Sequence, residues 1–170
     1  SKVARSAAVL GMKVLLCDPP RAEREGSKGF VSLDKLIERS DIITLHVPLS
    51  AHTFHLFGRE RLQELRPGQI LINSSRGEVV DCAALKDALR QKRLRAAVLD
   101  VWEGEPDIDR ELMGLVDIST AHIAGYSADG KANGTQAAVR AVAEVLGIEA
   151  LQDWKPGKLP LPAQELDFRI

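Results

Sequence analysis

The chain has 170 residues, of which 45% are hydrophobic and 28% charged, and its formal net charge is −1. This composition is typical of a folded globular domain and argues against disorder. The basic residues are scattered, their densest run (RQKRLR, 90–95) ends a helical pattern, and no apolar run reaches the roughly 18 residues of a membrane span. We therefore expect a cytoplasmic protein with no nucleic-acid or membrane partner, and the N-terminus shows no signal-peptide layout.

The first half of the chain alternates between helical and extended patterns. A helix is predicted in SKVARSAAVLG (1–11), with Gly11 as its end, and a short strand in KVLLCD (13–18). A second helix is predicted in SLDKLIERSD (32–41), capped by Ser32. The strand that follows, DIITLHVP (41–48), is a continuous apolar run, which predicts burial on both of its faces.

The same alternation continues to about residue 150. Two further helix–strand pairs are predicted at 58–75 and 81–102, and then a strand at 117–124 and a helix at 134–147. This order indicates a doubly wound α/β domain with a parallel sheet, covered on both faces and built with right-handed crossovers. Residues 151–170 carry Pro156, Pro160 and Pro162, which predicts a linker or extended arm instead of a domain.

The two cysteines, Cys17 and Cys82, lie far apart in the sequence. They form no CxxC pair and have no cluster of histidine or cysteine beside them. A disulfide framework and a metal site are therefore not expected, and both residues are predicted to be reduced thiols in the core.

Polar side chains follow the predicted strands at the point where each strand ends. In a doubly wound sheet the ligand crevice lies outside the carboxyl ends of the strands, so chemistry is expected there. The residues at these ends are Asp18, His46, Arg76, Asp100 to Glu105, and His122. An arginine, an acid and a histidine on three such ends favour a catalytic site over three unrelated structural residues.

Several motifs resemble the nucleotide-binding domain of the D-isomer-specific 2-hydroxyacid dehydrogenases. They are HVPLSAHTFHLFGRERLQELRPG (46–68), LINSSRGEVVD (71–81) and LDVWEGEP (99–106). A fourth, HIAGYSADGKANGT (122–135), resembles the erythronate-4-phosphate dehydrogenase branch of that family. The resemblance covers roughly residues 1 to 150. It implies a Rossmann-type fold and NAD-dependent oxidation of a phosphorylated 2-hydroxy acid, 4-phospho-D-erythronate, in pyridoxal 5′-phosphate biosynthesis.

By this resemblance Arg76, Glu105 and His122 are the catalytic residues. Imidazole titrates near neutral pH, so His122 is suited to take the hydroxyl proton, and a carboxylate such as Glu105 would stabilise the resulting imidazolium. Glu103 is the alternative acid; Glu105 is preferred because it precedes Pro106, as the acid of the family does. Arg76 offers a planar fork for the substrate carboxylate, although an ion pair with Asp81 is an alternative, purely structural role.

The resemblance also implies the residues that contact the cofactor. Asp18 matches the acid that binds the adenine ribose, which favours NAD, although Arg21 and Arg24 leave NADP open and Asp18 could instead be a turn residue. Further cofactor contacts are expected from four residues: Val47 through its backbone, Ser75, Asp100 and Gly125.

The substrate phosphate is expected near Tyr126, with Lys131 as a weaker candidate. The glycine-rich phosphate loop of the family would precede this sequence, so we expect a part of a longer enzyme, inactive in isolation and homodimeric as the full-length protein. Two alternatives remain open. One is another 2-hydroxyacid dehydrogenase, such as a phosphoglycerate dehydrogenase or glyoxylate reductase, and the other is a non-catalytic NAD-binding module.

Overall fold

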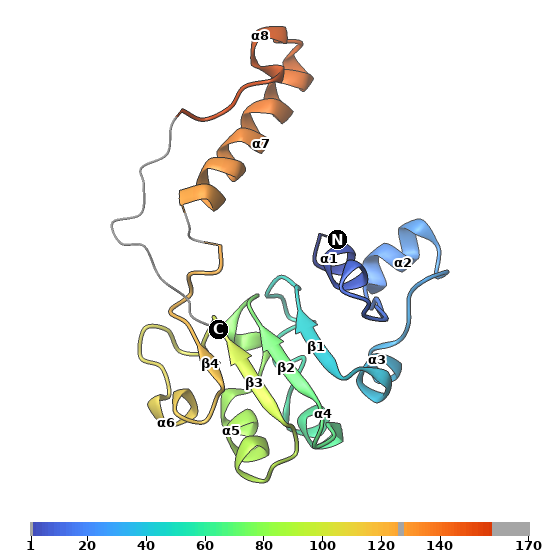
Figure 1. Cartoon of the computed structure of the whole chain (residues 1–170), viewed down its shortest axis with the longest axis vertical. Coiled ribbons are helices and arrows are strands. Elements are labelled where there is room, and N and C mark those ends of the chain that lie inside the picture. The colour runs from blue at the N-terminus through green and yellow to red at the C-terminus, as the bar shows by residue number, and fades with distance from the viewer. Residues whose placement is uncertain (1, 126–127, 158–170) are drawn as a thin grey trace. The chain divides into compact units, whose positions relative to one another are not determined.

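The computed structural model describes residues 2–125 and 128–157 (Figure 1). The chain divides into two compact units, Ser1–Ala121 and His122–Ile170. Unit 1 contains the sheet and unit 2 contains the longest helix, α7 (Ala128–Leu146).

Unit 1 is built on four parallel strands in the order β1-β2-β3-β4. The strands are β1 (Ile42–Leu45), β2 (Ile70–Asn73), β3 (Ala96–Leu99) and β4 (Ile118–Ser119). Leu45 pairs with Asn73, Asn73 with Leu99, and Leu99 with Ser119, so the strands end at the same edge of the sheet. The predicted parallel α/β sheet is confirmed.

Helices cover one face of this sheet. The helices between successive strands are α4 (Arg59–Glu64), α5 (Cys82–Arg90) and α6 (Arg110–Met113), and α3 (Leu33–Arg39) precedes β1 (Figure 1). The buried hydrophobic cluster joins these helices to one side of the strands, through residues such as Ile37, Leu62, Leu85, Ile43 and Leu71. Crossovers of one hand between adjacent strands leave their helices on the same face, which explains the arrangement.

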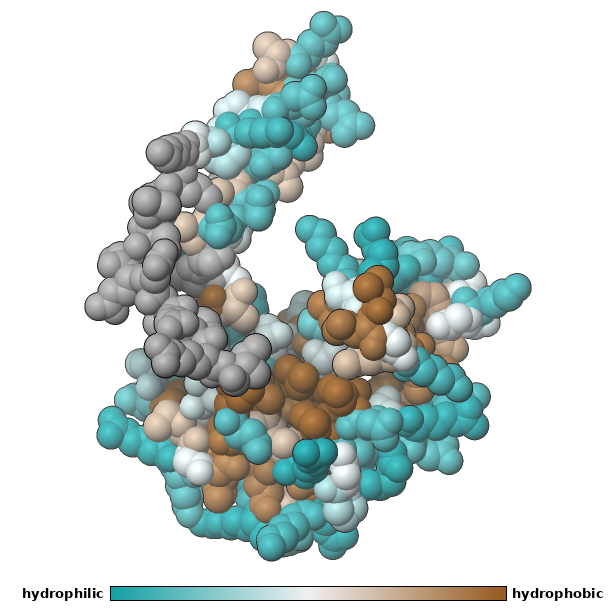
Figure 2. Space-filling model, viewed as in Figure 1, coloured by the Kyte–Doolittle hydropathy of each residue, from teal (hydrophilic) through white to brown (hydrophobic). Residues whose placement is uncertain are grey.

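The second face of the sheet is partly open within unit 1. Side chains of β1 alternate between exposed and buried, and Ile42 is 43% exposed whereas Ile43 is 2% exposed. Figure 2 shows hydrophobic residues gathered over the strands of this unit. The prediction that the 41–48 strand is buried on both faces is therefore wrong, because the helices of unit 1 pack on one side only.

The predicted helix at 1–11 is confirmed as α1 (Lys2–Val9), but the strand predicted at 13–18 is wrong. In that segment Leu16 forms only an isolated parallel bridge with Phe30. A strand needs a neighbour along its length, and a single bridge provides none. The helix α2 (Pro19–Glu25) was not predicted; Asp18 caps it and Pro19 opens its first turn.

Three more short helices were not predicted: η1 (Gly77–Val79), α6 and α8 (Glu149–Gln152). The expected arm at 151–170 is thus helical at its start, and residues 158–170 lie outside the described part. The helix α7 begins at Ala128, earlier than predicted, so Lys131 lies within it.

None of the helices in residues 2–125 and 128–157 combines the length and apolar character needed to cross a bilayer.

Both cysteines are free thiols, but only one belongs to the core. Cys82 is buried at the start of α5, whereas Cys17 is half-buried. The prediction of a core position is therefore confirmed for Cys82 and wrong for Cys17.

Candidate active site

Arg76 lies just beyond the carboxyl end of β2, on a segment held by Asn73. Asn73 is 1% exposed; its side-chain Nδ2 donates to the Arg76 carbonyl at 2.9 Å, and its Oδ1 accepts from the Ser75 hydroxyl at 2.8 Å. The backbone at Arg76 is extended, and its exposed guanidinium donates to the Ser75 carbonyl at 2.6 Å. Arg76 is therefore presented to solvent on a rigid support.

No ion pair joins Arg76 to Asp81 in the described residues. The Asp81 carboxylate instead caps α5 and accepts from the Ala84 N–H at 2.8 Å. The structural role considered for Arg76 therefore has no support in the geometry.

A second segment of the site follows β3, from Val101 to Asp107. Its acid Glu105 is exposed and its Oε1 accepts from the Trp102 N–H at 2.8 Å. Trp102 is itself buried, and its indole Nε1 donates to the Thr120 carbonyl at 2.9 Å. Glu105 is thus attached to a loop that is anchored in the core of unit 1.

The segments that carry Arg76 and Glu105 touch one another through Gly77. A Cβ atom on Gly77 would lie 2.1 Å from the carbonyl carbon and oxygen of Trp102 and 2.4 Å from the Glu103 nitrogen. Only glycine allows this approach, since real Cβ atoms do not come so close to backbone atoms. Two of the three predicted catalytic residues therefore lie on segments in direct contact.

The third predicted catalytic residue, His122, belongs to unit 2 and follows β4 by three residues. It is exposed and has a left-handed backbone (φ 54°). Gly125 also lies in unit 2 and is exposed, and Tyr126 lies outside the described residues.

Three of the predicted cofactor residues lie at the strand ends of unit 1. Ser75 and Asp100 are buried and Val47 is half-buried. The Asp100 carboxylate is oriented by the Thr120 hydroxyl, which donates to it at 2.5 Å. These polar groups fit a nicotinamide nucleotide, because a fixed carboxylate can accept hydrogen bonds from its amide or ribose hydroxyl groups and the Ser75 hydroxyl can donate or accept one.

Asp18 has a local structural role that was considered as an alternative to cofactor binding. Its Oδ1 accepts from the Arg21 N–H at 3.1 Å and caps α2. The Arg21 guanidinium donates to Glu25 at 2.7 Å, and this hydrogen bond raises the pKa of Arg21. Arg21 is thus paired with Glu25 on the exposed surface of α2.

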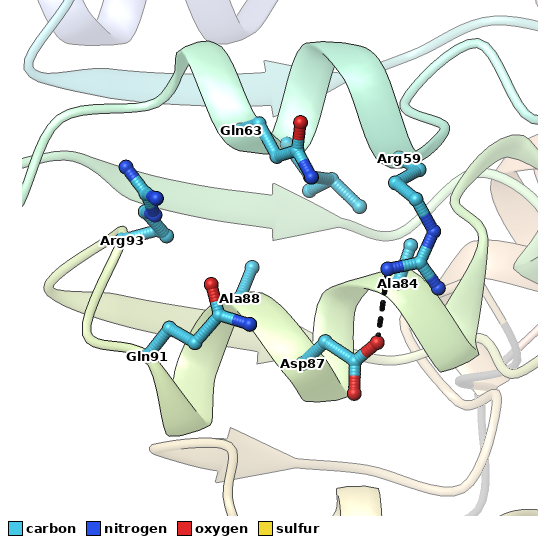
Figure 3. A pocket seen from close by; sticks show the side chains of 8 residues that line it. Arg59, Gln63, Ala84, Asp87, Ala88, Gln91 and Arg93 are labelled. Carbon is cyan, nitrogen blue, oxygen red and sulfur yellow. Dashed lines mark hydrogen bonds and ion pairs between the residues drawn. The ribbon is translucent and has the colours of Figure 1, made fainter.

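Two pockets among the described residues lie away from this site. A pocket of 10 Å³ between α4 and α5 is bordered by the exposed Arg59–Asp87 ion pair (Figure 3). A larger, open hollow of 430 Å³ is lined by Pro67, Arg95 and Asp117, which precede β2, β3 and β4. The first is about the size of one water molecule, and the second lies at the edge opposite the candidate site.

Four residues that shape this site were missed in the sequence: His55, Asn73, Gly77 and Thr120. Asn73 could have been noticed in the sequence, because it is a polar residue at the end of the apolar run ILIN. His55 could not, because its partner, Glu103, is 48 residues away. Within residues 2–125 and 128–157, no group of histidine, cysteine and acidic side chains is arranged to hold a metal ion.

Comparison with known proteins identifies relatives of the whole domain. Residues 1–124 match the family model of the D-isomer specific 2-hydroxyacid dehydrogenase, NAD binding domain. An erythronate-4-phosphate dehydrogenase of Stutzerimonas stutzeri is 56% identical over 144 residues, which are 82% of this chain and 38% of that protein. One of Porphyromonas gingivalis is 50% identical over 152 residues, which are 85% of this chain and 41% of that protein.

Solved structures give the same fold. The D-lactate dehydrogenase of Aquifex aeolicus, crystallised with NAD and lactic acid, superposes with a TM-score of 0.70 at 33% identity, over 88% of this chain and 51% of that one. The chain spans about two fifths of the length of the curated relatives it matches. By the match over residues 1–124 and these identities, the chain belongs to the D-isomer specific 2-hydroxyacid dehydrogenases and carries their NAD-binding domain.

Proposed function

We propose that the protein carrying this chain oxidises 4-phospho-D-erythronate to its 2-oxo acid, with NAD as hydride acceptor, in the formation of pyridoxal 5′-phosphate. The main observation in support of a catalytic site is the contact through Gly77, which holds the segment of Arg76 against the segment of Glu105. The substrate is supported by the relatives at 50–56% identity that are named erythronate-4-phosphate dehydrogenases.

Arg76 binds the substrate carboxylate in this proposal. A guanidinium presents two parallel N–H groups, which match the two oxygens of a carboxylate. The exposed position of Arg76, on a backbone held by Asn73, supports this role. The same positive charge polarises the neighbouring carbonyl as it forms.

His122 is the proposed general base and Glu105 its carboxylate partner. When the C2–H bond breaks, the hydride passes to NAD, the hydroxyl proton passes to the His122 imidazole, and the C–O bond becomes a carbonyl. Glu105 is favoured over Glu103 because both Glu103 oxygens are already bonded, to His55 and to the Cys82 N–H. A carboxylate beside the imidazole stabilises the charge that it gains.

The proposed cofactor contacts are those expected from the sequence. Asp18, whose Oδ1 caps α2, would bond the adenine ribose through its carboxylate, Val47 and Ser75 would line the dinucleotide, and Asp100 and Gly125 would contact the nicotinamide side. Tyr126 as the phosphate contact and the homodimeric state remain predictions.

The residue roles are tested with His122→Ala and Glu105→Gln. Loss of the general base is expected to lower kcat by roughly 10²- to 10⁴-fold, with NAD affinity unchanged, because the proton transfer belongs to the chemical step. NADH formation and NAD titration measure the two quantities. His52→Ala, at an exposed histidine on a turn, is the matched control. A wild-type kcat in His122→Ala would exclude it as the base.

A second candidate function is the oxidation of an unphosphorylated 2-hydroxy acid. The 33% identity to the D-lactate dehydrogenase crystallised with lactic acid favours it. A preference for D-lactate over 4-phospho-D-erythronate in the same assay would establish this second candidate.

A further inference from the structure

We propose that Glu103 and His55 are positioning residues, whose pairing fixes the loop that presents Glu105. This inference rests on the function proposed above, in which Glu105 supports the base. It concerns two side chains for which that function gives no role.

Glu103 is bonded through both of its carboxylate oxygens. Oε1 lies 2.7 Å from Nε2 of His55, and Oε2 accepts from the Cys82 N–H at 3.1 Å. Each side chain of the His55–Glu103 pair is 30% exposed. The pair is therefore partly withdrawn from water, and one carboxylate joins the loop after β3 to the start of α5 and to the 51–57 segment.

Cys82 completes this junction as a neutral group. Burial raises the pKa of the Cys82 thiol, so no thiolate competes with Glu103 for hydrogen-bond donors. The Cys82 N–H lies in the first turn of α5, where a helix leaves its N–H groups without intrahelical partners. The Glu103 carboxylate satisfies one of them and lies at the positive end of the helix dipole.

His55 is itself fixed on several sides. Its backbone N–H donates to the Glu78 carbonyl at 2.8 Å, and its ring stacks on Phe54 with centroids 4.0 Å apart. Its backbone is left-handed (φ 46°), a conformation that is unfavourable for a residue other than glycine. The surroundings hold His55 in this conformation, and the imidazole thereby reaches Glu103.

Glu103 lies two residues before the acid that the pair is proposed to position. Glu105 is bonded back to the Trp102 N–H, and the intervening Gly104 is left-handed (φ 80°), so the loop turns sharply between the two acids. The segment from Val101 to Asp107 contains no strand or helix. Its geometry therefore depends on side-chain anchors, and Glu103 supplies two of them.

Loss of the pair is expected to lower kcat more than it weakens binding. A displacement of about 1 Å in a group that acts in the transition state can cost about 10²-fold in rate. We expect Glu103→Ala and His55→Ala each to lower kcat by about 10- to 100-fold per active site, with NAD affinity unchanged. The double variant should be no slower than either single variant, because the two residues act as one unit.

The isosteric variant Glu103→Gln separates positioning from direct chemistry. Glutamine keeps an oxygen for the Cys82 N–H and an amide donor for the imidazole, so it should restore kcat to within about threefold of the wild type. If the charge of Glu103 were itself needed in the reaction, Glu103→Gln would be as slow as Glu103→Ala. Asp87→Asn, at the exposed Arg59–Asp87 pair of Figure 3, is the control for loss of a surface ion pair.

The experiment measures kcat and KM for 4-phospho-D-erythronate in each variant of the protein that carries this chain. The rates are divided by the number of NAD sites found by fluorescence titration, so partial unfolding does not count as lost catalysis. A wild-type kcat per site in Glu103→Ala, or failure of Glu103→Gln to restore it, overturns the inference. Glu105→Gln is assayed in parallel. If Glu105→Gln is fully active, Glu105 has no role for the pair to support; if Glu105→Gln is impaired while Glu103→Ala is not, only the positioning role fails. The proposed function itself fails if the wild-type protein does not oxidise 4-phospho-D-erythronate.

Discussion

Gly77 is a residue whose identity is dictated by the geometry of the site. It follows Arg76 directly and is buried against the Trp102 backbone. Its φ is not left-handed, so the need for glycine comes from space alone, and a methyl group there would overlap a peptide unit.

We therefore predict that Gly77→Ala costs at least about 2 kcal/mol in the free energy of unfolding, since two backbone segments would have to separate. Gly68→Ala is the matched control, because a Cβ there meets nothing within 4 Å, and its effect should stay below about 1 kcal/mol. Urea denaturation of both variants measures the difference. Equal urea midpoints would show that the contact through Gly77 is not tight.

The sequence allowed the residues at strand ends to be predicted, but not the residues that hold them. Arg76 and Asp100 could be chosen because each follows an apolar run, and Glu105 because of its place in the LDVWEGEP motif. His55 lies in an irregular segment without periodicity, and its contact with Glu103 spans 48 positions. Such long-range side-chain contacts leave no local pattern to read.

At the scale of the elements, the strands have two unlike faces. Ile42 and Ile43 are neighbours in β1 with the same side chain, yet they are 43% and 2% exposed. Successive side chains of a strand point to opposite faces, and only the face of Ile43 meets the helices.

We predict that Ile43→Ala costs about 2–5 kcal/mol of stability, as expected for a buried isoleucine, and that Ile42→Ala costs less than about 1.5 kcal/mol. The two variants differ only in the face that they alter, so each is the control for the other. Urea midpoints give the comparison. If Ile42→Ala were as destabilising as Ile43→Ala, the second face of the sheet would be covered in the folded protein.

The sequence predicted whether a segment is a helix or a strand better than it predicted how many helices and strands there are. Apolar runs identified all four strands of the sheet, and caps such as Ser32 marked helix starts. Short helices such as α2 and α6 were missed because four to seven residues are too few to show a helical period. The strand predicted at 13–18 was wrong because strand formation depends on a partner, which a run of apolar residues does not reveal.

At the scale of the whole molecule, the candidate catalytic residues are divided between the two units. Arg76 and Glu105 lie in Ser1–Ala121, whereas His122 opens the second unit. The proposed chemistry needs all three residues around one substrate.

We propose that this domain serves the oxidation of a phosphorylated 2-hydroxy acid. The most direct test compares NADH formation by the protein that carries this chain on 4-phospho-D-erythronate, D-erythronate and D-lactate. The account predicts a kcat/KM for 4-phospho-D-erythronate at least about tenfold above the other two, because a site that binds the phosphate discriminates against substrates that lack it. Equal rates on all three acids, or a preference for D-lactate, would contradict it.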